Sequence, residues 1–375
     1  MLTPVRLTAI WFAVILAGSF LLPAQEKTDE PCLMQSPRVT AYRIEHESPG
    51  GRILTLTAVG DVMMGGRVIP VIRKQGRDYP FDATREHLSK SDLAIANLEA
   101  PFGTGGTPFD KKYTFMVPPE FAPALKQAGL DLLTLANNHI LDYGPDGLYS
   151  TMEVLDTLGL AYCGAGKNRL QAENPAILQA GERRIAFLAY SMTYPSEFWA
   201  TSTEPGTAYP DIDRMVRTIE ALADSTDKVI VTFHWGGELK TAPKGYQQLY
   251  AHKAVDAGAD MVIGHHPHVL QAIELYRGRL IAYSLGNFVF GSYSNKTKSS
   301  AILKAYFNDS GFLLAEVIPL SVDNYAVEFQ PTPLEGEARR AVLDELNTIS
   351  FELNGGKHII RPSGLIAPES RAASE

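Results

Sequence analysis

The sequence predicts an α/β domain with substantial parallel strand pairing and a more β-rich late part. Short apolar, β-branched runs bounded by Gly, Pro or polar residues alternate with segments of helical periodicity. With 45% hydrophobic and 20% charged residues, the chain of 375 residues has the composition of a globular protein and enough apolar residues for a large core.

The elements follow in order along the chain. Pro118 and Pro119 begin a helix that Gly129 ends, and Pro145 begins another. Two hairpins are expected, within residues 176–190 and 271–283. The expected strands are Arg52–Val59, Asp92–Ala96, Asp131–Ala136, Ile185–Tyr190, Lys228–Phe233, Met261–Ile263 and the β-rich region Ala301–Gln330. The expected helices are Val68–Lys74, Pro118–Ala128, Pro145–Leu158, Ile212–Ala223 and Gln247–Ala257, with a charged helix after Glu335.

The N-terminal residues predict that the chain is exported. Residues 1–25 carry Arg6, an uncharged apolar stretch from Leu7 to Leu22 and a small residue after Pro23, which is typical of a signal peptide. The stretch is shorter than the roughly 20 residues of a membrane span, and an uncleaved anchor stays open. The expected location is the periplasm or the outer face of the cytoplasmic membrane. Residues 26–50 are expected to be a linker, 51–332 the folded domain, and 333–375 a C-terminal helix and tail.

Charge and cysteine content exclude some classes. The net charge of -8 is unfavourable for a nucleic-acid-binding protein. Cys32 and Cys163 form neither a disulfide framework nor a zinc-finger pattern, although a pairing between them stays open.

Polar residues gather where the expected strands end, most densely at Gly264-His265-His266-Pro267-His268. Pro267 fixes its own φ and disfavours helix in His266 before it, so His266 and His268 are expected to form a rigid pair, with His265 as a flanking residue. Ligands of open α/β sheets collect at the carboxyl ends of strands, so these side chains are expected to converge. The other polar residues at expected strand ends are Asp61, Asn97, Glu99, Asn138, His139 and His234.

Carboxylate, amide and imidazole groups together favour a divalent metal such as Zn, Mn or Fe. Such a metal lowers the pKa of bound water to about 7 and polarises a phosphoryl or acyl oxygen. Neither a G-x-S-x-G nucleophile motif nor a phosphate-binding glycine loop accompanies the cluster.

Six motifs follow one another along the chain: Gly60–Gly65, Asn97–Glu99, Ala136–Gly144, His234–Gly236, Gly264–Val269 and Ser284–Phe288. In these motifs and their order the chain resembles the CapA family of bacterial capsule and poly-γ-glutamate biosynthesis proteins, whose fold is similar to that of the calcineurin-like metallophosphoesterases. The resemblance covers roughly residues 53–290. It implies a cell-envelope protein with a metallophosphoesterase-like β-sandwich of mixed sheets, flanked by helices.

The resemblance also implies roles for individual residues. His139 is the expected catalytic acid, assisted by Asp61 and by Asp142, which orients it or merely forms a turn. Met63 stands where a phosphoesterase has a second ligand, and Glu99 takes the place of the bridging aspartate. The expected metal ligands, for one or two ions, are Asp61, Glu99, Asn138, His234, His266 and His268. Only Asn287 among the expected substrate-binding residues rests on a family motif, and the chemistry of the side chains suggests the others, which are Arg67, Lys112, Asn97 and Trp235. Core packing of Trp235 and plain surface charge for Arg67 and Lys112 stay open.

Two main hypotheses of function follow. The first is an exported metal-dependent hydrolase or transferase acting on an anionic cell-surface polymer or on a small phosphoester or amide. The second is a non-catalytic, polymer-binding accessory of a membrane-bound capsule synthesis complex. A metal-free acid/base enzyme, such as an epimerase, is a third possibility.

Overall fold

The computed structural model of the chain describes residues 42–44 and 53–368. The expected leader and Cys32 lie outside these residues, and Cys163 is buried as a free thiol. No helix in the described ranges has both the length and the apolar character needed to cross a bilayer.

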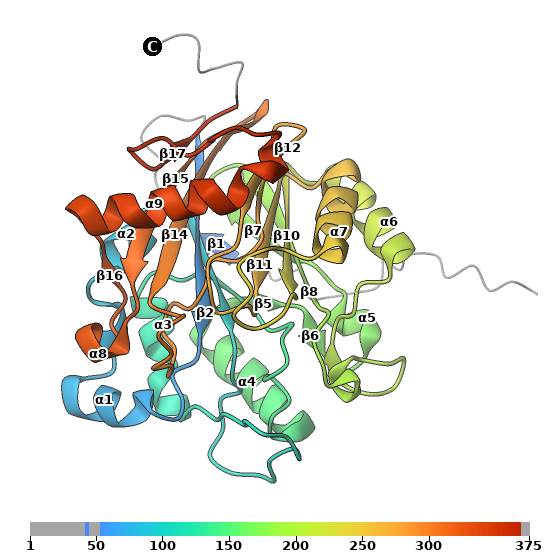
Figure 1. Cartoon of the computed structure of the whole chain (residues 1–375). Coiled ribbons are helices and arrows are strands. Elements are labelled where there is room, and N and C mark those ends of the chain that lie inside the picture. The colour runs from blue at the N-terminus through green and yellow to red at the C-terminus, as the bar shows by residue number, and fades with distance from the viewer. Residues whose placement is uncertain (1–41, 45–52, 369–375) are drawn as a thin grey trace, which may run out of the picture. The chain divides into compact units, whose positions relative to one another are not determined.

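Two mixed β-sheets form the centre of residues 53–368, which confirms the expected fold class (Figure 1). The first has the order β1 (Tyr42–Ile44), β7 (Ala176–Ala180), β8 (Arg183–Ser191), β10 (Lys228–His234), β11 (Met261–His265), β13 (Arg279–Ala282) and β12 (Ile273–Tyr276). The second has the order β16 (Thr332–Pro333), β15 (Gly311–Ser321), β14 (Ser299–Asn308), β2 (Leu54–Val62), β3 (Leu93–Leu98), β4 (Leu132–Thr134) and β5 (Ala161–Cys163), and β17 (Leu365–Ile366) pairs with β15. A small separate pair joins β6 (Ala165–Gly166) to β9 (Gly206–Thr207).

Strands that carry functional residues run parallel within their sheets. β2, β3, β4 and β5 are parallel neighbours, as are β8, β10 and β11. The two expected hairpins, β7–β8 and β12–β13, are antiparallel as predicted. Since parallel strands end at the same edge, residues that follow them are brought together there.

The strands alternate their side chains between two apolar layers. Leu56 of β2 and Ile230 of β10 contribute to one core cluster between the sheets. On the outer face of the first sheet, Val229 and Val231 pack with Ile219 of a helix. Because both faces are covered, the strands read as continuous apolar runs.

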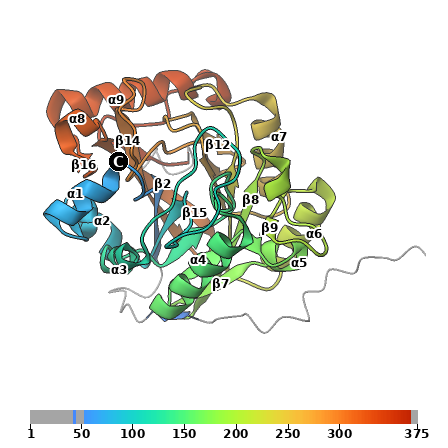
Figure 2. The ribbon, with the colours of Figure 1, turned by 90° about the horizontal axis from the view of Figure 1, so that it is seen from below.

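Helices cover the outer faces of both sheets (Figures 1 and 2). One group packs on the second sheet and the other, formed by α6 and α7, on the first. The helices are α1 (Val68–Gln75), α2 (Arg85–Ser89), α3 (Pro123–Gln127), α4 (Gly144–Leu158), α5 (Arg169–Ala172), α6 (Ile212–Ala223), α7 (Gly245–Asp256), α8 (Asn324–Val327) and α9 (Gly336–Ser350).

Aspartates begin several of the parallel strands. Asp131, just before β4, accepts a hydrogen bond from the Ala94 amide of β3 at 2.8 Å. Asp260, just before β11, does the same for Val229 of β10 at 3.0 Å. Each carboxylate satisfies an amide at the start of the neighbouring strand, which helps to fix the register of the pair.

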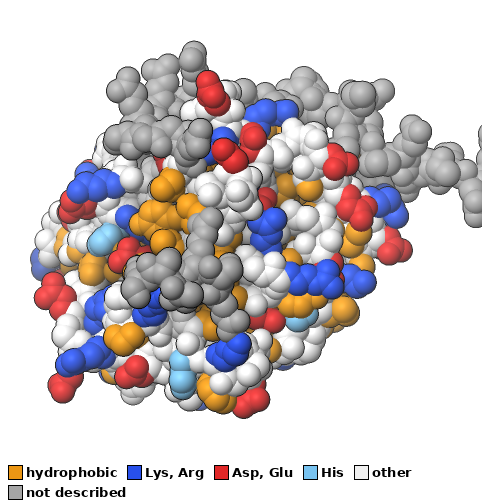
Figure 3. Space-filling view, turned by 90° about the horizontal axis from the view of Figure 1, so that it is seen from above, with side chains coloured by type: hydrophobic (Ala, Val, Ile, Leu, Met, Phe, Trp, Pro, Cys, Tyr) orange, Lys and Arg blue, Asp and Glu red, His pale blue; other side chains and the backbone are white. Residues whose placement is uncertain are grey.

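The C-terminal segment belongs to the same core. Leu343 and Leu346 of α9 lie in the cluster between the sheets, and β17 adds to the edge at β15. Within the expected linker, β1 pairs in parallel with β7. On the face shown in Figure 3, acidic and basic side chains are interspersed rather than gathered by sign.

Candidate functional site

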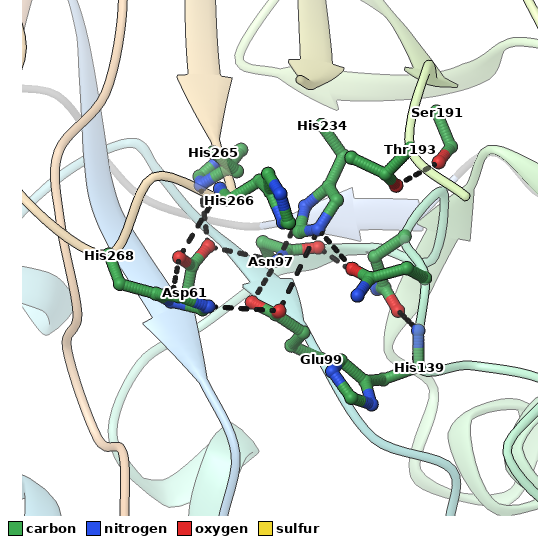
Figure 4. Close-up of polar contacts among 12 residues, drawn as sticks. Asp61, Asn97, Glu99, His139, Ser191, Thr193, His234, His265, His266 and His268 are labelled. Carbon is green, nitrogen blue, oxygen red and sulfur yellow. Dashed lines mark hydrogen bonds and ion pairs between the residues drawn. The ribbon is translucent and has the colours of Figure 1, made fainter. Parts of the chain in front are cut away.

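The carboxyl ends of β2, β3, β10 and β11 meet at one place, so both sheets contribute to the candidate site (Figure 4). Asp61 comes from β2, and Glu99 follows β3. His234 ends β10, and His265 ends β11. Residues far apart in the sequence are therefore brought together by the fold, as the sequence predicts.

Glycine makes the approach of these strands possible. A Cβ on Gly60 would lie 1.9 Å from the Gly286 carbonyl oxygen, far inside van der Waals contact. This closeness lets the Asp61 amide donate to that oxygen at 3.0 Å. A Cβ on Gly264 would likewise lie 1.9 Å from the Tyr283 carbonyl oxygen. Both glycines are needed for close backbone approach.

Asp61 is fully buried and surrounded by donors. Its Oδ1 lies 3.2 Å from His265 Nδ1, its Oδ2 lies 3.2 Å from His268 Nδ1, and Asn97 Nδ2 donates to Oδ1 at 2.9 Å. Burial alone would raise the pKa of Asp61, but the two histidines hold it well below its usual range. Asp61 is therefore an ionised carboxylate.

Glu99 is the second buried acid. Its Oε2 accepts a hydrogen bond from Asn97 Nδ2 at 3.2 Å, and its Oε1 lies 3.6 Å from His234 Nε2 and 3.7 Å from His268 Nε2. Burial and the nearby charge of Asp61 raise the pKa of Glu99 well above its usual range. A neighbouring cation would relieve this cost.

His234 and His266 are buried imidazoles whose rings lie 4.8 Å apart. His234 Nε2 is 2.7 Å from Asn138 Oδ1. Burial, with the charge of its histidine neighbours, lowers the pKa of His234 well below its ordinary value and that of His266 to about 3. Both are neutral, which is the form that binds metal.

The backbone around Pro267 is strained. His266 has φ 93° and His268 has φ 59°, a region that residues other than glycine rarely adopt. Such strain persists where the surroundings impose it, and it is concentrated at functional sites. The rigid histidine pair expected from the sequence is present, and Asn287 Oδ1 fixes His268 Nδ1 at 2.9 Å.

His139 stands at the edge of the cluster with Asp142 and Lys111. His139 Nδ1 is 2.8 Å from Asp142 Oδ2, which leaves Nε2 for contact with a substrate. Lys111 Nζ is 2.5 Å from Asp142 Oδ1 and 3.2 Å from His139 Nδ1. The rings of Phe115 and Phe290 pack on His139 and His268, each at 4.7 Å, and shield that side of the site.

The residues fit a bound divalent metal. Two groups have ligand atoms within 4.8 Å of one another, one of Glu99, His234 and His266 and the other of Asp61, Glu99 and His268. Glu99 belongs to both. Two buried atoms, Glu99 Oε1 and His266 Nδ1, lack a hydrogen-bond partner among the described residues, as expected of ligands whose partner is a cation.

Asn97, one of the predicted substrate-binding residues, acts within the network: it is fully buried and bridges the two acids. The side-chain oxygen of Asn137 accepts a hydrogen bond from the His139 amide at 3.0 Å and so holds the turn between them.

One predicted substrate-binding residue is wrong, while two others are exposed and stay predictions. Trp235 is fully buried between Phe233 and Tyr283, with its indole N–H bound to the Tyr283 carbonyl, so stacking on a substrate is excluded. Lys112 is exposed and lies over the ring of Tyr113. Arg67 lies over Tyr293 on the surface.

The structure also adds residues that the sequence analysis missed. His265 contacts Asp61 and is not a flanking residue, because β11 extends further than predicted and turns its ring inward. Lys111, not Lys112, reaches His139. The hydroxyls of Ser191 and Thr193, 2.9 Å apart, lie beside His234 at the end of β8 (Figure 4).

The fold and site together define an α/β sandwich protein with a buried histidine–carboxylate cluster suited to divalent metal. Comparison with known proteins then gives the family. The model of the family described as "Bacterial capsule synthesis protein PGA_cap" matches residues 55–292 of the chain. The chain is 35% identical over 289 residues to "Capsule biosynthesis protein CapA" of Bacillus anthracis, covering 75% of this chain and 69% of that protein.

It is also 30% identical over 331 residues to "PGA biosynthesis protein CapA" of Bacillus subtilis, covering 86% of this chain and 84% of that protein. Among solved structures, it is similar to Haemophilus influenzae NAD nucleotidase, with 14% identity and a TM-score of 0.43 over 79% of this chain and 62% of that chain. The chain belongs to the bacterial capsule synthesis protein family, which confirms the resemblance found in the sequence.

Proposed function

We propose that this chain is a metal-dependent hydrolase or transferase that acts on an anionic cell-surface polymer during capsule synthesis. The observation that carries the proposal is the convergence of neutral imidazoles and carboxylates from both sheets, with Glu99 shared between two ligand groups. Membership of the family supports the class of pathway, and the name of the Bacillus subtilis relative suggests poly-γ-glutamate as the polymer.

In this proposal the metal is held by Asp61, Glu99, Asn138, His234, His266 and His268. The mixture of nitrogen and oxygen donors suits Mn, Zn or Fe, and the two ligand groups allow for two ions. When bound, such a metal supplies Lewis acidity that polarises a phosphoryl or acyl oxygen.

The protein's own groups supply orientation and a proton. Asp142 fixes the ring of His139, so that Nε2 can donate a proton to a leaving group or stabilise developing negative charge. Asn97 keeps the two acids in place, and Phe115 and Phe290 limit the access of water.

The location belongs to the same proposal. Relatives named for capsule biosynthesis support a place in the cell envelope. The N-terminal segment is proposed to export the chain, either as a cleaved signal or as an anchor that brings it to membrane partners of a synthesis complex.

Metal analysis of the purified chain tests the proposal. We expect near-stoichiometric Mn, Zn or Fe, lost in His266→Ala but kept in His358→Ala, a variant of an exposed histidine. Retained metal in both variants would place the ion elsewhere. Metal-free protein after growth in each metal would rule out the hydrolase.

A polymer-binding accessory is the second candidate. Met63 favours it, because a buried apolar side chain stands where a phosphoesterase has a ligand, and its sulfur only accepts a bond from the Gly65 amide. Unaltered binding of poly-γ-glutamate by a metal-free His266→Ala protein would support this role. If the chain is instead a metal-free acid/base enzyme, chelators are expected to leave its activity unchanged.

A further inference from the structure

An exposed group of aromatic rings lies in the segment after β8, and the proposed reaction does not use it. Tyr194 exposes 78% of its surface and Tyr209 exposes 37%. Trp199 contacts both: its ring centre is 5.8 Å from that of Tyr194 and 4.2 Å from that of Tyr209. We call these three residues the aromatic shelf.

The shelf is held rigidly although it is exposed. The indole N–H of Trp199 donates to the Thr193 carbonyl at 3.1 Å, and the Trp199 amide donates to the Ser196 carbonyl at 3.0 Å. Trp199 also forms a backbone bridge with Thr207 of β9. A large ring fixed in advance loses little conformational entropy when it binds a ligand, as at many recognition sites.

The shelf borders the candidate metal centre. Thr193, the residue before Tyr194, points its hydroxyl toward Ser191 beside His234 (Figure 4). The Met192 amide donates to the His234 carbonyl at 2.9 Å, which fixes the start of this segment to the end of β10. A chain-like molecule bound on the shelf would therefore lie next to the site.

The segment that carries the shelf is acidic on balance. Between residues 193 and 214 one charged side chain is basic, Arg214, which lies 3.7 Å from Asp211. The other four charged side chains are acidic and exposed: Glu197, Glu204, Asp211 and Asp213. A polyanion would be repelled by them. The shelf therefore does not suit the anionic polymer of the proposed function.

We propose that the aromatic shelf binds an uncharged sugar of a glycan chain beside the metal centre. The C–H face of a pyranose ring is apolar and packs on aromatic rings, while its hydroxyls can bond to tyrosine and to acidic side chains. The shelf is then a second binding site, whose ligand is an uncharged sugar, whereas the metal centre acts on an anionic polymer.

Fluorescence titration of the full chain with soluble N-acetylglucosamine oligomers and glucose oligomers tests the proposal. The chain has three tryptophans, so the titration uses a Trp11→Phe background in which Trp199 reports binding, since Trp235 is fully buried. We expect binding that weakens roughly three- to tenfold in Tyr194→Ala, the loss of one aromatic contact. Tyr194 is so exposed that its removal leaves the fold intact. Tyr325→Ala, with a tyrosine 74% exposed on α8, is the matched control and keeps full affinity.

Further measurements distinguish binding at the shelf from binding at the metal centre, and a sugar from a charged ligand. His266→Ala is expected to bind the sugars unchanged, so loss of the metal centre does not imitate loss of the shelf. Absence of sugar binding, or equal affinity in Tyr194→Ala and Tyr325→Ala, overturns the proposal. Binding of poly-γ-glutamate or of a short oligolysine that depends on Tyr194 overturns it as well, in favour of a charged ligand.

Discussion

Replacing Glu99 by Gln is expected to change stability in opposite directions with and without metal. Glu99 is fully buried, its Oε1 has no hydrogen-bond partner among the described residues, and Asp61 lies close by. Without metal, an acid in this position is costly, because neither water nor a cation compensates it. Gln keeps the shape and an acceptor for Asn97 but carries no charge.

The two effects have comparable magnitudes. Removing a poorly paired buried acid is expected to stabilise the metal-free protein by about 1–3 kcal/mol. Metal at about 1,000 times its dissociation constant stabilises the unmodified chain by about 4.1 kcal/mol, which exceeds the whole of that range. Because Glu99 belongs to both ligand groups, the Glu99→Gln variant loses most of that gain. The variant is thus the more stable protein after chelation and gains little stability when metal is added.

Urea unfolding of both proteins, with chelator and with added Mn or Zn, measures the four free energies of unfolding. His358→Ala serves as the control that should match the unmodified chain in both conditions. If the Gln variant is destabilised without metal, or gains as much from metal as the unmodified chain, the assignment of Glu99 as a shared ligand is wrong.

Three further predictions concern the scaffold. Burial raises the pKa of Asp131 to about 7, so the folded protein holds one more proton than the unfolded chain from about pH 4 to 7. The free energy of unfolding is therefore expected to fall as the pH rises through that window, by up to about 4 kcal/mol. Asp131→Asn should remove this slope in pH-dependent urea unfolding, and Asp227→Asn, at an exposed position with the same kind of amide bond, should not. Lys111→Ala should cost about 2 kcal/mol in the same assay because it leaves a buried carboxylate without its ammonium partner, whereas Lys112→Ala should stay within about 0.5 kcal/mol. Gly60→Ala should cost about 3 kcal/mol and reduce metal content, since its Cβ would lie 1.9 Å from a backbone oxygen; a stable, metal-loaded variant contradicts the close approach.

Strand ends were predictable from the sequence because a buried parallel strand is a short apolar run with a clear end. That rule brings Asp61 and Glu99 together at one edge of the second sheet. It does not place His234 beside them, because β10 belongs to the first sheet and meets them only through the packing of one sheet on the other. Side chains alternate between the two faces of a strand, so an error of one residue in where the strand ends reverses the side that the next residue faces. Trp235 and His265 were both misassigned for this reason, since one packs in the core and the other contacts Asp61.

Loops were less predictable because their geometry depends on tertiary contacts. Lys111 and Lys112 are equivalent in sequence, yet only Lys111 meets Asp142, because the loop folds back toward His139. The aromatic shelf is equally hidden, since Trp199 and Tyr209 are separated by β9 and meet only after the segment doubles back.

The position of the site between two sheets has an energetic consequence. Glu99 follows a strand of one sheet, while His234 and His266 come from strand ends of the other, and all three belong to one ligand group. A cation held by this group would connect the two sheets at one end of the core between them. Since the ligands come together only in the folded chain, the free energy of metal binding adds to that of folding. Metal content and global stability are therefore expected to change together, as they would not for a metal bound within a single loop.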